Sequence, residues 1–201
     1  MSNQNKIIED FYKRVEMKGY KGKIISAQHI PDLRQDIQKH HESKALDPEF
    51  YEEYKPYFEF EPDVDFPQIN SLFMISTPVP QFEAIFHYND KEISLLIPPT
   101  YLYALRIIDQ MKELVEEILA PKGYNIAYAL LPQKTLAVRS GLAEYGRNNI
   151  TYVSGIGSFH RLTTFYSDFP FEQDNWQELR MMDICKECSA CVRKCPTGAI
   201  S

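Results

Sequence analysis

All four cysteines of the chain, Cys185, Cys188, Cys191 and Cys195, lie near its C-terminal end in the spacing C-x2-C-x2-C-x3-C, followed by proline. Two-residue gaps between thiolates wrap a backbone loop around a metal centre and direct its N–H groups at that centre, as a 4Fe–4S cluster requires. A structural zinc site usually divides its ligands into two separated pairs, which this run does not. The motif therefore predicts a 4Fe–4S cluster held by these thiols, with zinc and inert buried thiols as the alternatives.

The fourth cysteine raises a question of completeness. In two-cluster ferredoxins the last cysteine of such a run ligates the other cluster, so Cys195 would need companions that this sequence does not contain. Either Cys195 closes a single cluster in a different local geometry, or the chain is a fragment. We expect the second case, with residues 181–201 as the start of an incomplete ferredoxin-type 4Fe–4S module.

A second stretch with chemical potential is LAVRSGLAEYGRNNITYV, in which Gly141 precedes Gly146, Arg147 and Asn148. Its spacing is close to that of the phosphate-binding G-x-x-x-x-G-K-[ST] loop, but Asn148 lacks the hydroxyl that would hold Mg²⁺, and Arg147 replaces the lysine. The segment before the glycines is also helix-like, whereas such a loop follows a strand. The sequence thus disfavours a nucleotide site and favours a helix that ends at Gly146, with a basic turn after it.

The composition is that of one globular domain. The 201 residues are 44% hydrophobic and carry a net charge of −6, which argues against a wide phosphate-binding face. The N-terminus is polar and mixed in charge, and no apolar run is long enough to span a bilayer. We therefore expect a cytoplasmic protein without membrane contact, in which clustered cysteines stay reduced and serve as metal ligands.

Helices and strands alternate along residues 1–180, which predicts an α+β cofactor-binding domain ahead of the cysteine module. The strongest pattern is the helix expected at residues 100–120, whose apolar stripe begins at Leu102 and Leu105 and is followed by Gly123. Residues 46–70 are too irregular for a regular element and predict an ordered wrap. Further helices are expected at residues 3–18 and from Pro31 to about Ser43, strands in KIISAQHI, SLFMISTPV, YNIAYALL, NITYV and FHRLTTFY, and a hairpin around Asn89 and Asp90.

Taken together, the stretch LAVRSGLAEYGRNNITYVSGIGSFHRLTTFYSDFP and the later CKECSACVRKCPTGAI resemble the epoxyqueuosine reductase family. That family runs an alanine-rich helix into a Gly-Leu-Gly-x-x-Gly-Lys turn, then a strand, a Gly-Ser turn, another strand and a ferredoxin-type segment. The resemblance covers residues 134–200. It implies a nitroreductase-like mixed sheet with flanking helices, shared with reductive dehalogenases, a bound cobalamin, and a truncated ferredoxin-like 4Fe–4S segment.

The resemblance also implies which residues face the cofactor. The turn around the two glycines would lie against the corrinoid, and a later strand would help to wall its pocket. The residues concerned are Gly141, Leu142, Gly146 and Arg147 in the turn, and Ser158 and Phe159 in the strand.

Three positions depart from the family pattern. The family's second glycine is Ala143, its lysine is Arg147, and an ungapped count back from Gly141 places its catalytic aspartate at Ala127. No carboxylate lies nearby to donate a proton. Tyr128 is adjacent and a tyrosine can act as a general acid, although an aromatic residue in a buried strand is the plainer interpretation.

The sequence therefore predicts a reductase that uses a corrinoid fed by a 4Fe–4S cluster, with an unidentified substrate. The alternative is an electron-transfer or cluster-carrying module without substrate chemistry of its own, which Ala127 favours. The expected partners are an electron-donor protein or small reductant and a small-molecule substrate, while the net charge and Ala127 disfavour tRNA. Among the histidines, only His160 falls close enough to the supposed pocket to be kept as a candidate.

Overall fold

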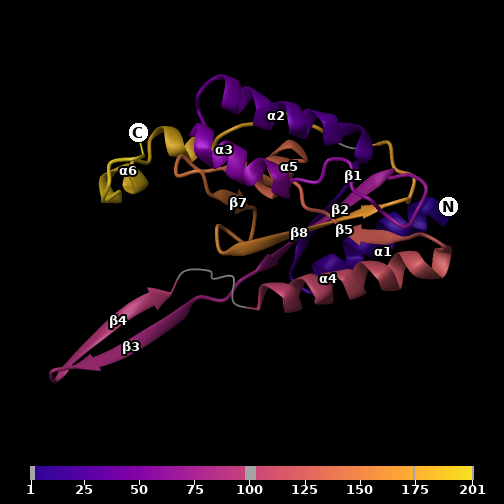
Figure 1. Ribbon diagram of the computed structural model, residues 1–201. Helices are drawn as coiled ribbons and strands as arrows, with labels where there is room; N and C mark the ends of the chain where they lie inside the picture. Colours follow the sequence, from indigo (N-terminus) through magenta and orange to yellow (C-terminus); the bar gives the residue numbers. More distant parts are fainter. Residues whose placement is uncertain (1–2, 98–102, 174, 201) are drawn as a thin grey trace.

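A four-stranded sheet forms the centre of the computed structural model, which describes residues 3–97, 103–173 and 175–200. Its strands are β1 (Lys21–Ser26), β2 (Ser71–Pro78), β8 (His160–Ser167) and β5 (Ile126–Tyr128), in the order β1-β2-β8-β5 (Figure 1). Every pairing among them is antiparallel, so they do not form the mixed sheet that the resemblance implies. The α+β class itself is confirmed.

Helices cover both faces of this sheet (Figure 1). On one face α1 (Asn3–Met17) and α4 (Ala104–Leu119) pack on a cluster that includes Phe73 and Phe165. On the other face α2 (Ile30–Glu42) and α5 (Gln133–Arg139) pack on a cluster that includes Leu72 and Tyr166. Successive residues of a strand point to opposite faces of the sheet, and both faces are covered here. Strand β2 is therefore buried along almost its whole length.

The two long predicted helices are confirmed with one correction. Helix α1 buries Ile7, Phe11 and Val15 at helical spacing and is followed by Gly19 with φ +72°. In its C-terminal half helix α4 buries only its apolar face, from Met111 to Leu119, whereas Leu105 is 76% exposed and does not belong to the core stripe. The start of that predicted helix, with Leu102 and Pro99, lies outside the described residues. Gly123, with φ +81°, ends the helical segment as expected.

The segment between α2 and β2 contains more regular structure than its composition suggests. It forms α3 (Pro48–Tyr54) and the 3-10 turn η2 (Lys55–Tyr57), and the Asp47 side chain caps α3 by accepting from the N–H of Phe50. Beyond these turns the expected irregular wrap is present. It is tied to the core because the Glu59 carbonyl accepts a hydrogen bond from the buried Tyr166 hydroxyl.

A β-hairpin projects from the sheet as an arm (Figure 1). Its strands are β3 (Phe82–Tyr88) and β4 (Lys91–Ile97), joined by Asn89 and Asp90. Both turn residues have positive φ, 48° and 60°, as a two-residue turn matched to the strand twist requires. The predicted hairpin is thus confirmed.

A second, shorter hairpin follows α5 and corrects the sequence interpretation. Helix α5 ends at Arg139, and Gly141 follows it with φ +71°, so the helix does not continue to Gly146. The intervening residues form β6 (Ala143–Tyr145), which pairs with β7 (Thr151–Val153) across the Gly146 turn. The helix therefore ends at the first of the two glycines, five residues before the one expected, because the left-handed conformation of Gly141 does not continue a helix. The chain then enters strand β6.

Candidate functional site

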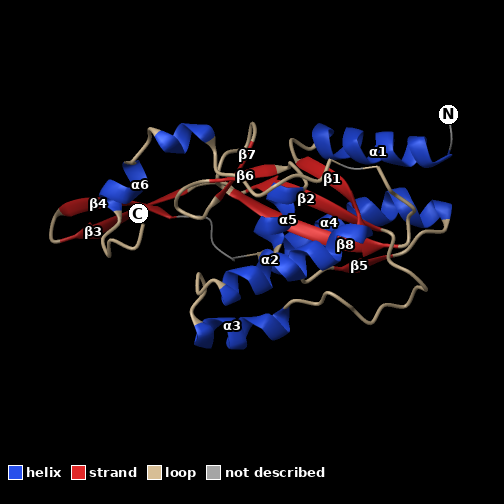
Figure 2. Ribbon diagram, turned by 90° about the horizontal axis from the view of Figure 1, so that it is seen from above, coloured by secondary structure: helices blue, strands red, loops and turns tan. Residues whose placement is uncertain are grey.

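The cysteine segment lies at the same end of the molecule as the hairpin arm (Figures 1 and 2). It contains the 3-10 turn η4 (Asp183–Lys186) and the short helix α6 (Ala190–Lys194). All four cysteines are free thiols: Cys188 is exposed, and Cys185, Cys191 and Cys195 are half-buried. Solvent can therefore reach this segment.

The thiols have the donor chemistry of an iron–sulfur site. The hydroxyl of Thr197, 3.5 Å from the Cys195 sulfur, together with backbone N–H groups that follow it, lowers the pKa of that thiol to about 7, so it ionises more readily than a free cysteine. In the described part of the chain, no three His, Cys, Asp or Glu side chains are grouped so that they could hold a metal ion. The number and spacing of the thiols fit a 4Fe–4S cluster, and their convergence on one stays a prediction.

The strand before the Gly146 turn is bonded directly to the chain that leads into the cysteines. The Tyr145 N–H donates to the Arg180 carbonyl over 3.2 Å, and the Met182 N–H donates to the Tyr145 carbonyl over 2.8 Å. Two residues after Tyr145, the Arg147 guanidinium donates to the backbone carbonyl of Cys185 over 3.0 Å. The stretch of residues 141–147, called the glycine turn below, and the first cysteine, which the sequence singled out separately, are thus neighbours.

A buried ion pair fixes the linker that joins the domain to this segment. Arg139 of α5 makes two hydrogen bonds to the Asp36 carboxylate of α2, of 2.7 and 3.0 Å, and both side chains are largely buried. Arg139 also donates to the Gln177 carbonyl over 3.2 Å, and Trp176 stacks on His29. The hydrogen bonds to Asp36 raise the pKa of Arg139, so the guanidinium stays charged. We call this Arg139–Asp36 pair the clasp. The sequence offered no signal for this pair because its members are far apart along the chain.

The two glycines of the turn are closed in by the protein's own side chains. A Cβ at Gly141 would lie 2.4 Å from the Gln177 amide nitrogen, and one at Gly146 would lie 2.5 Å from a ring carbon of Tyr152. Leu142 is buried in the core next to them. At position 141 it is the φ of +71° that favours glycine, because the amide end of Gln177 is flexible, whereas at position 146 a Cβ would also lie 2.6 Å from Asn148 and 3.3 Å from the Ile150 carbonyl. In this arrangement side chains of the protein occupy the space next to both Cα atoms.

The predicted pocket-wall residues Ser158 and Phe159 lie in the turn before β8 rather than in the strand. Both are half-buried, and the Phe159 carbonyl accepts from the Val79 N–H over 2.9 Å. The strand begins one residue later because Gly155 and Gly157, both with positive φ, extend the preceding turn. Their contact with a cofactor stays a prediction.

His160 is held by hydrogen bonds on both ring nitrogens. Its Nδ1 is 2.9 Å from the Ser76 hydroxyl, and its Nε2 is 3.0 Å from the Thr151 carbonyl. Nε2 therefore donates to that carbonyl, and in the neutral imidazole Nδ1 accepts from the Ser76 hydroxyl. Burial lowers the pKa of His160 in agreement with this arrangement. The geometry favours a structural role for this histidine.

Ala127 and Tyr128 point to opposite faces of the sheet. Ala127 is paired with Tyr166 and packs on the cluster that also contains Ala143 of the glycine turn. Tyr128 is paired with Phe165, which belongs to the cluster under α1 and α4. Burial raises the pKa of Tyr128, although the charge of Arg161 lowers it, so the phenol holds its proton more tightly than a free tyrosine. A catalytic role for Tyr128 stays a prediction, on the face away from the turn.

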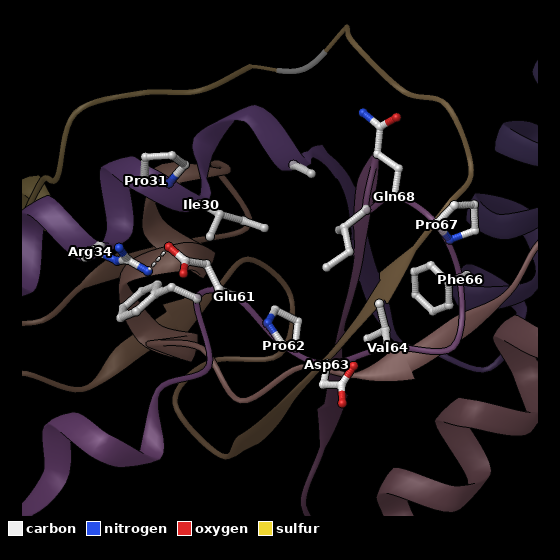
Figure 3. A pocket seen from close by; sticks show the side chains of 13 residues that line it. Ile30, Pro31, Arg34, Glu61, Pro62, Asp63, Val64, Phe66, Pro67 and Gln68 are labelled. Carbon is white, nitrogen blue, oxygen red and sulfur yellow. Dashed lines mark hydrogen bonds and ion pairs between the residues drawn. The ribbon is translucent and has the colours of Figure 1, made fainter.

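A pocket of about 530 Å³ lies elsewhere, between the start of α2 and the wrap (Figure 3). Arg34 and Glu61 bridge one side of it with an ion pair of 2.7 Å. None of the predicted site residues lines it. Its lining residues are Ala27, Ile30, Pro31, Arg34, Phe60, Glu61, Pro62, Asp63, Val64, Phe66, Pro67, Gln68 and Ile69.

Comparison with known proteins supports the chemistry of the cysteine segment. Residues 180–201 match the family model described as "4Fe-4S binding domain". Among curated proteins, the epoxyqueuosine reductase of Cyclobacterium marinum is 34% identical over 103 residues, which are 49% of this chain and 32% of that protein. The tetrachloroethene reductive dehalogenase of Desulfitobacterium hafniense is 33% identical over 66 residues, which are 33% of this chain and 12% of that protein.

The overall fold is that of a solved epoxyqueuosine reductase. The structure of the Bacillus subtilis enzyme covers 98% of this chain with a TM-score of 0.64 at 19% identity, and the match takes up 54% of the B. subtilis chain. The chain therefore spans about half the length of that relative. The similarity to epoxyqueuosine reductases and, over a shorter stretch, to reductive dehalogenases that the sequence predicted is confirmed. None of the helices in the described part of the chain combines the length and hydrophobicity that crossing a bilayer requires.

Proposed function

We propose that this chain belongs to an iron–sulfur reductase in which the cysteine segment passes electrons to a cofactor held near the glycine turn. One observation carries the proposal: β6 bonds the linker before the cysteines, and Arg147 bonds the carbonyl of Cys185. Electron transfer requires donor and acceptor to be held close together, and the protein's part in such chemistry is to position them. The Arg139–Asp36 clasp supports this positioning from behind the linker.

The proposed ligands of the cluster are Cys185, Cys188, Cys191 and Cys195. A 4Fe–4S cluster supplies one-electron transfer, and its potential depends on nearby charge and hydrogen bonds. Arg147 would bring a positive charge next to the first ligand, and the exposure of Cys188 leaves that side open to an electron-donor protein or small reductant.

A corrinoid is the cofactor that the resemblance implies, together with a nitroreductase-like arrangement of the catalytic domain. Its proposed neighbours are the glycine turn and the turn with Ser158 and Phe159. The close packing of Gln177 and Tyr152 over the glycines does not by itself fit a macrocycle at that point, so this part of the proposal rests on the resemblance.

The proposed substrate is a small molecule. One solved epoxyqueuosine reductase with the same fold is described in complex with an epoxyqueuosine-modified tRNA stem loop. The net charge of −6 and an alanine at position 127, which packs on the core, weigh against the same substrate here.

The alternative function is an electron-transfer or cluster-carrying module without substrate chemistry of its own. Two observations favour it: the glycine turn is filled by Gln177 and Tyr152, and neither Ala127 nor Tyr128 presents a carboxylate. Binding of a cofactor separates the two functions. Cobalamin titrated into the folded protein should shift its spectrum toward the base-off form if the reductase proposal holds. If calorimetry shows that the folded protein binds no corrinoid, the result supports the alternative function of an electron-transfer module.

The cluster itself is tested by anaerobic purification with iron, sulfide and zinc analysis. The wild type should show the broad visible absorbance of 4Fe–4S proteins, which bleaches on reduction. Cys188→Ser should lose it, because the harder serine oxygen is a poor substitute for thiolate at iron, while the neighbouring Ser189→Ala should keep it. Stoichiometric zinc without iron in the wild type would contradict the proposal.

A further inference from the structure

The hairpin arm of β3 and β4 has one face that is almost wholly apolar. Residues opposite one another in register share a face, and one face is made by the cross-strand pairs Phe82–Ile97, Ala84–Leu95, Phe86–Ile93 and Tyr88–Lys91. Lys91, at the tip, is its single charged side chain. The large apolar side chains on this face are exposed, from 37% for Ile97 to 69% for Tyr88.

The opposite face of the arm is polar and internally satisfied. The Ser94 hydroxyl donates to the Glu83 carboxylate, and His87 lies 3.5 Å from the Glu92 carboxylate. Its two apolar members, Ile85 and Leu96, are diagonal neighbours, each paired across the strands with a polar residue, Ser94 and Glu83 respectively. The arm is therefore amphipathic, like an antiparallel sheet that has one buried face and one solvent-exposed face.

Nothing in the described part of the chain covers the apolar face. Strands β3 and β4 make extensive contact only with each other among the described elements, and Figure 1 shows the arm standing away from the sheet and its helices. A two-stranded hairpin alone is marginally stable in water, and it needs a packed hydrophobic face to persist. The arm thus requires a partner surface.

We infer that this partner is a second copy of the chain, whose arm packs face to face with the first. About half of each large apolar side chain is exposed, so two such faces in contact would bury on the order of 1,000 Å² in total, near the lower end for specific interfaces. A two-fold contact brings the same patch of both subunits together, and a face without charges apart from its tip is complementary to itself. An antiparallel arrangement of the arms keeps the two Lys91 side chains apart.

A membrane surface fits the arm less well than a second copy. Segments that lie on membranes carry Lys and Arg on their polar face, because these residues are attracted to anionic lipid. The polar face of the arm carries Glu83 and Glu92 instead, and the chain as a whole has a net charge of −6. Anionic lipid would therefore repel both the polar face and the molecule.

The test measures self-association of the whole chain by sedimentation over a range of concentrations. The arm provides matched variants: Phe86 and Leu95 on the apolar face are 52% and 51% exposed, and Ile85 and Leu96 on the polar face are 56% and 58% exposed. The wild type should sediment as a dimer. Phe86→Glu and Leu95→Glu should weaken the dimer on the order of 100-fold, because each would bury an unpaired charge.

The control variants Ile85→Glu and Leu96→Glu should change the dissociation constant less than about threefold, within the usual effect of a surface substitution. Circular dichroism should show an unchanged fold in all four, because the arm lies outside both core clusters. A wild type that is monomeric at about 100 μM, or a dimer weakened equally by substitutions on both faces, would overturn the inference. So would a monomer that floats with anionic lipid vesicles and loses this property in Phe86→Glu.

Discussion

The guanidinium of Arg147 lies 3.0 Å from the backbone carbonyl of Cys185 and donates a hydrogen bond to it. This bond joins the turn after β6 to the first residue of the cysteine motif. If a 4Fe–4S cluster binds there, the arginine places a permanent positive charge beside it. A positive charge stabilises the reduced, more negative state of a cluster and so raises its reduction potential.

Arg147→Met should therefore lower the reduction potential of the cluster, on the order of 50 mV, since its loss removes one nearby positive charge. Redox titration of the reconstituted protein, followed by electron paramagnetic resonance, measures this shift. Lys122→Met, in the turn after α4, removes the same charge far from the cysteines and should leave the potential unchanged. An identical potential in wild type and Arg147→Met would show that the contact does not persist in the loaded protein.

Gly141→Ala should destabilise the fold by about 1–2 kcal/mol through its left-handed φ of +71°, and by less than about 1 kcal/mol more for moving the flexible amide end of Gln177 aside. Gly19→Ala provides a control for the first effect, because Gly19 has φ +72° with nothing near its Cβ. It should cost about 1–2 kcal/mol. Adding Gln177→Ala to Gly141→Ala should recover the difference, measured by urea unfolding. Equal losses at both glycines would mean that the contact with Gln177 is unimportant.

Asp36→Asn should cost about 3 kcal/mol in free energy of unfolding, because it removes the buried counter-charge of Arg139 and leaves only an exposed one. The same guanidinium also pairs with Glu178, whose side chain is 94% exposed. Glu178→Gln is therefore the matched control and should change stability by less than about 1 kcal/mol. Denaturant unfolding at neutral pH compares the two, and similar losses would contradict the assignment of the buried clasp to Asp36.

The stability of the protein should decrease below neutral pH partly through His160. Burial lowers the pKa of this histidine in the folded state, so the unfolded chain binds a proton at a higher pH than the folded one. The contribution of His160 is complete above the pKa of the unfolded chain and is lost as the pH falls toward the folded pKa. Urea unfolding at pH 7.5 and 5.5 should show a smaller loss in His160→Gln than in the wild type, whereas equal losses would exclude this contribution.

The wild type should show negligible turnover of epoxyqueuosine-containing tRNA, even with cobalamin and a reductant supplied. A positioned carboxylic acid typically contributes about 10²–10⁴-fold to proton transfer, and Ala127 offers none. Residue 127 packs on the core cluster that includes Leu142 and Ala143. Measurable activity of the Ala127→Asp variant would therefore show a family active site retuned to another substrate. Robust wild-type turnover would contradict the alignment, and Tyr128→Phe would then test the adjacent phenol.

The sequence by itself determined the features that depend on near neighbours along the chain. The thiol spacing and the proline after Cys195 indicated the cluster chemistry, and the Asn89–Asp90 turn predicted the hairpin, because two residues with positive φ match the twist of the flanking strands. The spacing of the apolar residues in α1 predicted its buried face, because residues three or four apart lie on the same side of a helix. Chemistry and local conformation of this kind require no knowledge of what lies across the molecule.

Only the tertiary structure decided which of these features meet. The Arg139–Asp36 pair and the Arg147–Cys185 contact join segments that no local pattern relates, and the filling of the Gly141 and Gly146 positions by Gln177 and Tyr152 depends on the same chain path. Tyr128 lies on the face away from the glycine turn because the register of β5 on β8 sets which residues point where. Such contacts depend on the packing of the whole chain, which the pattern of neighbouring residues does not contain.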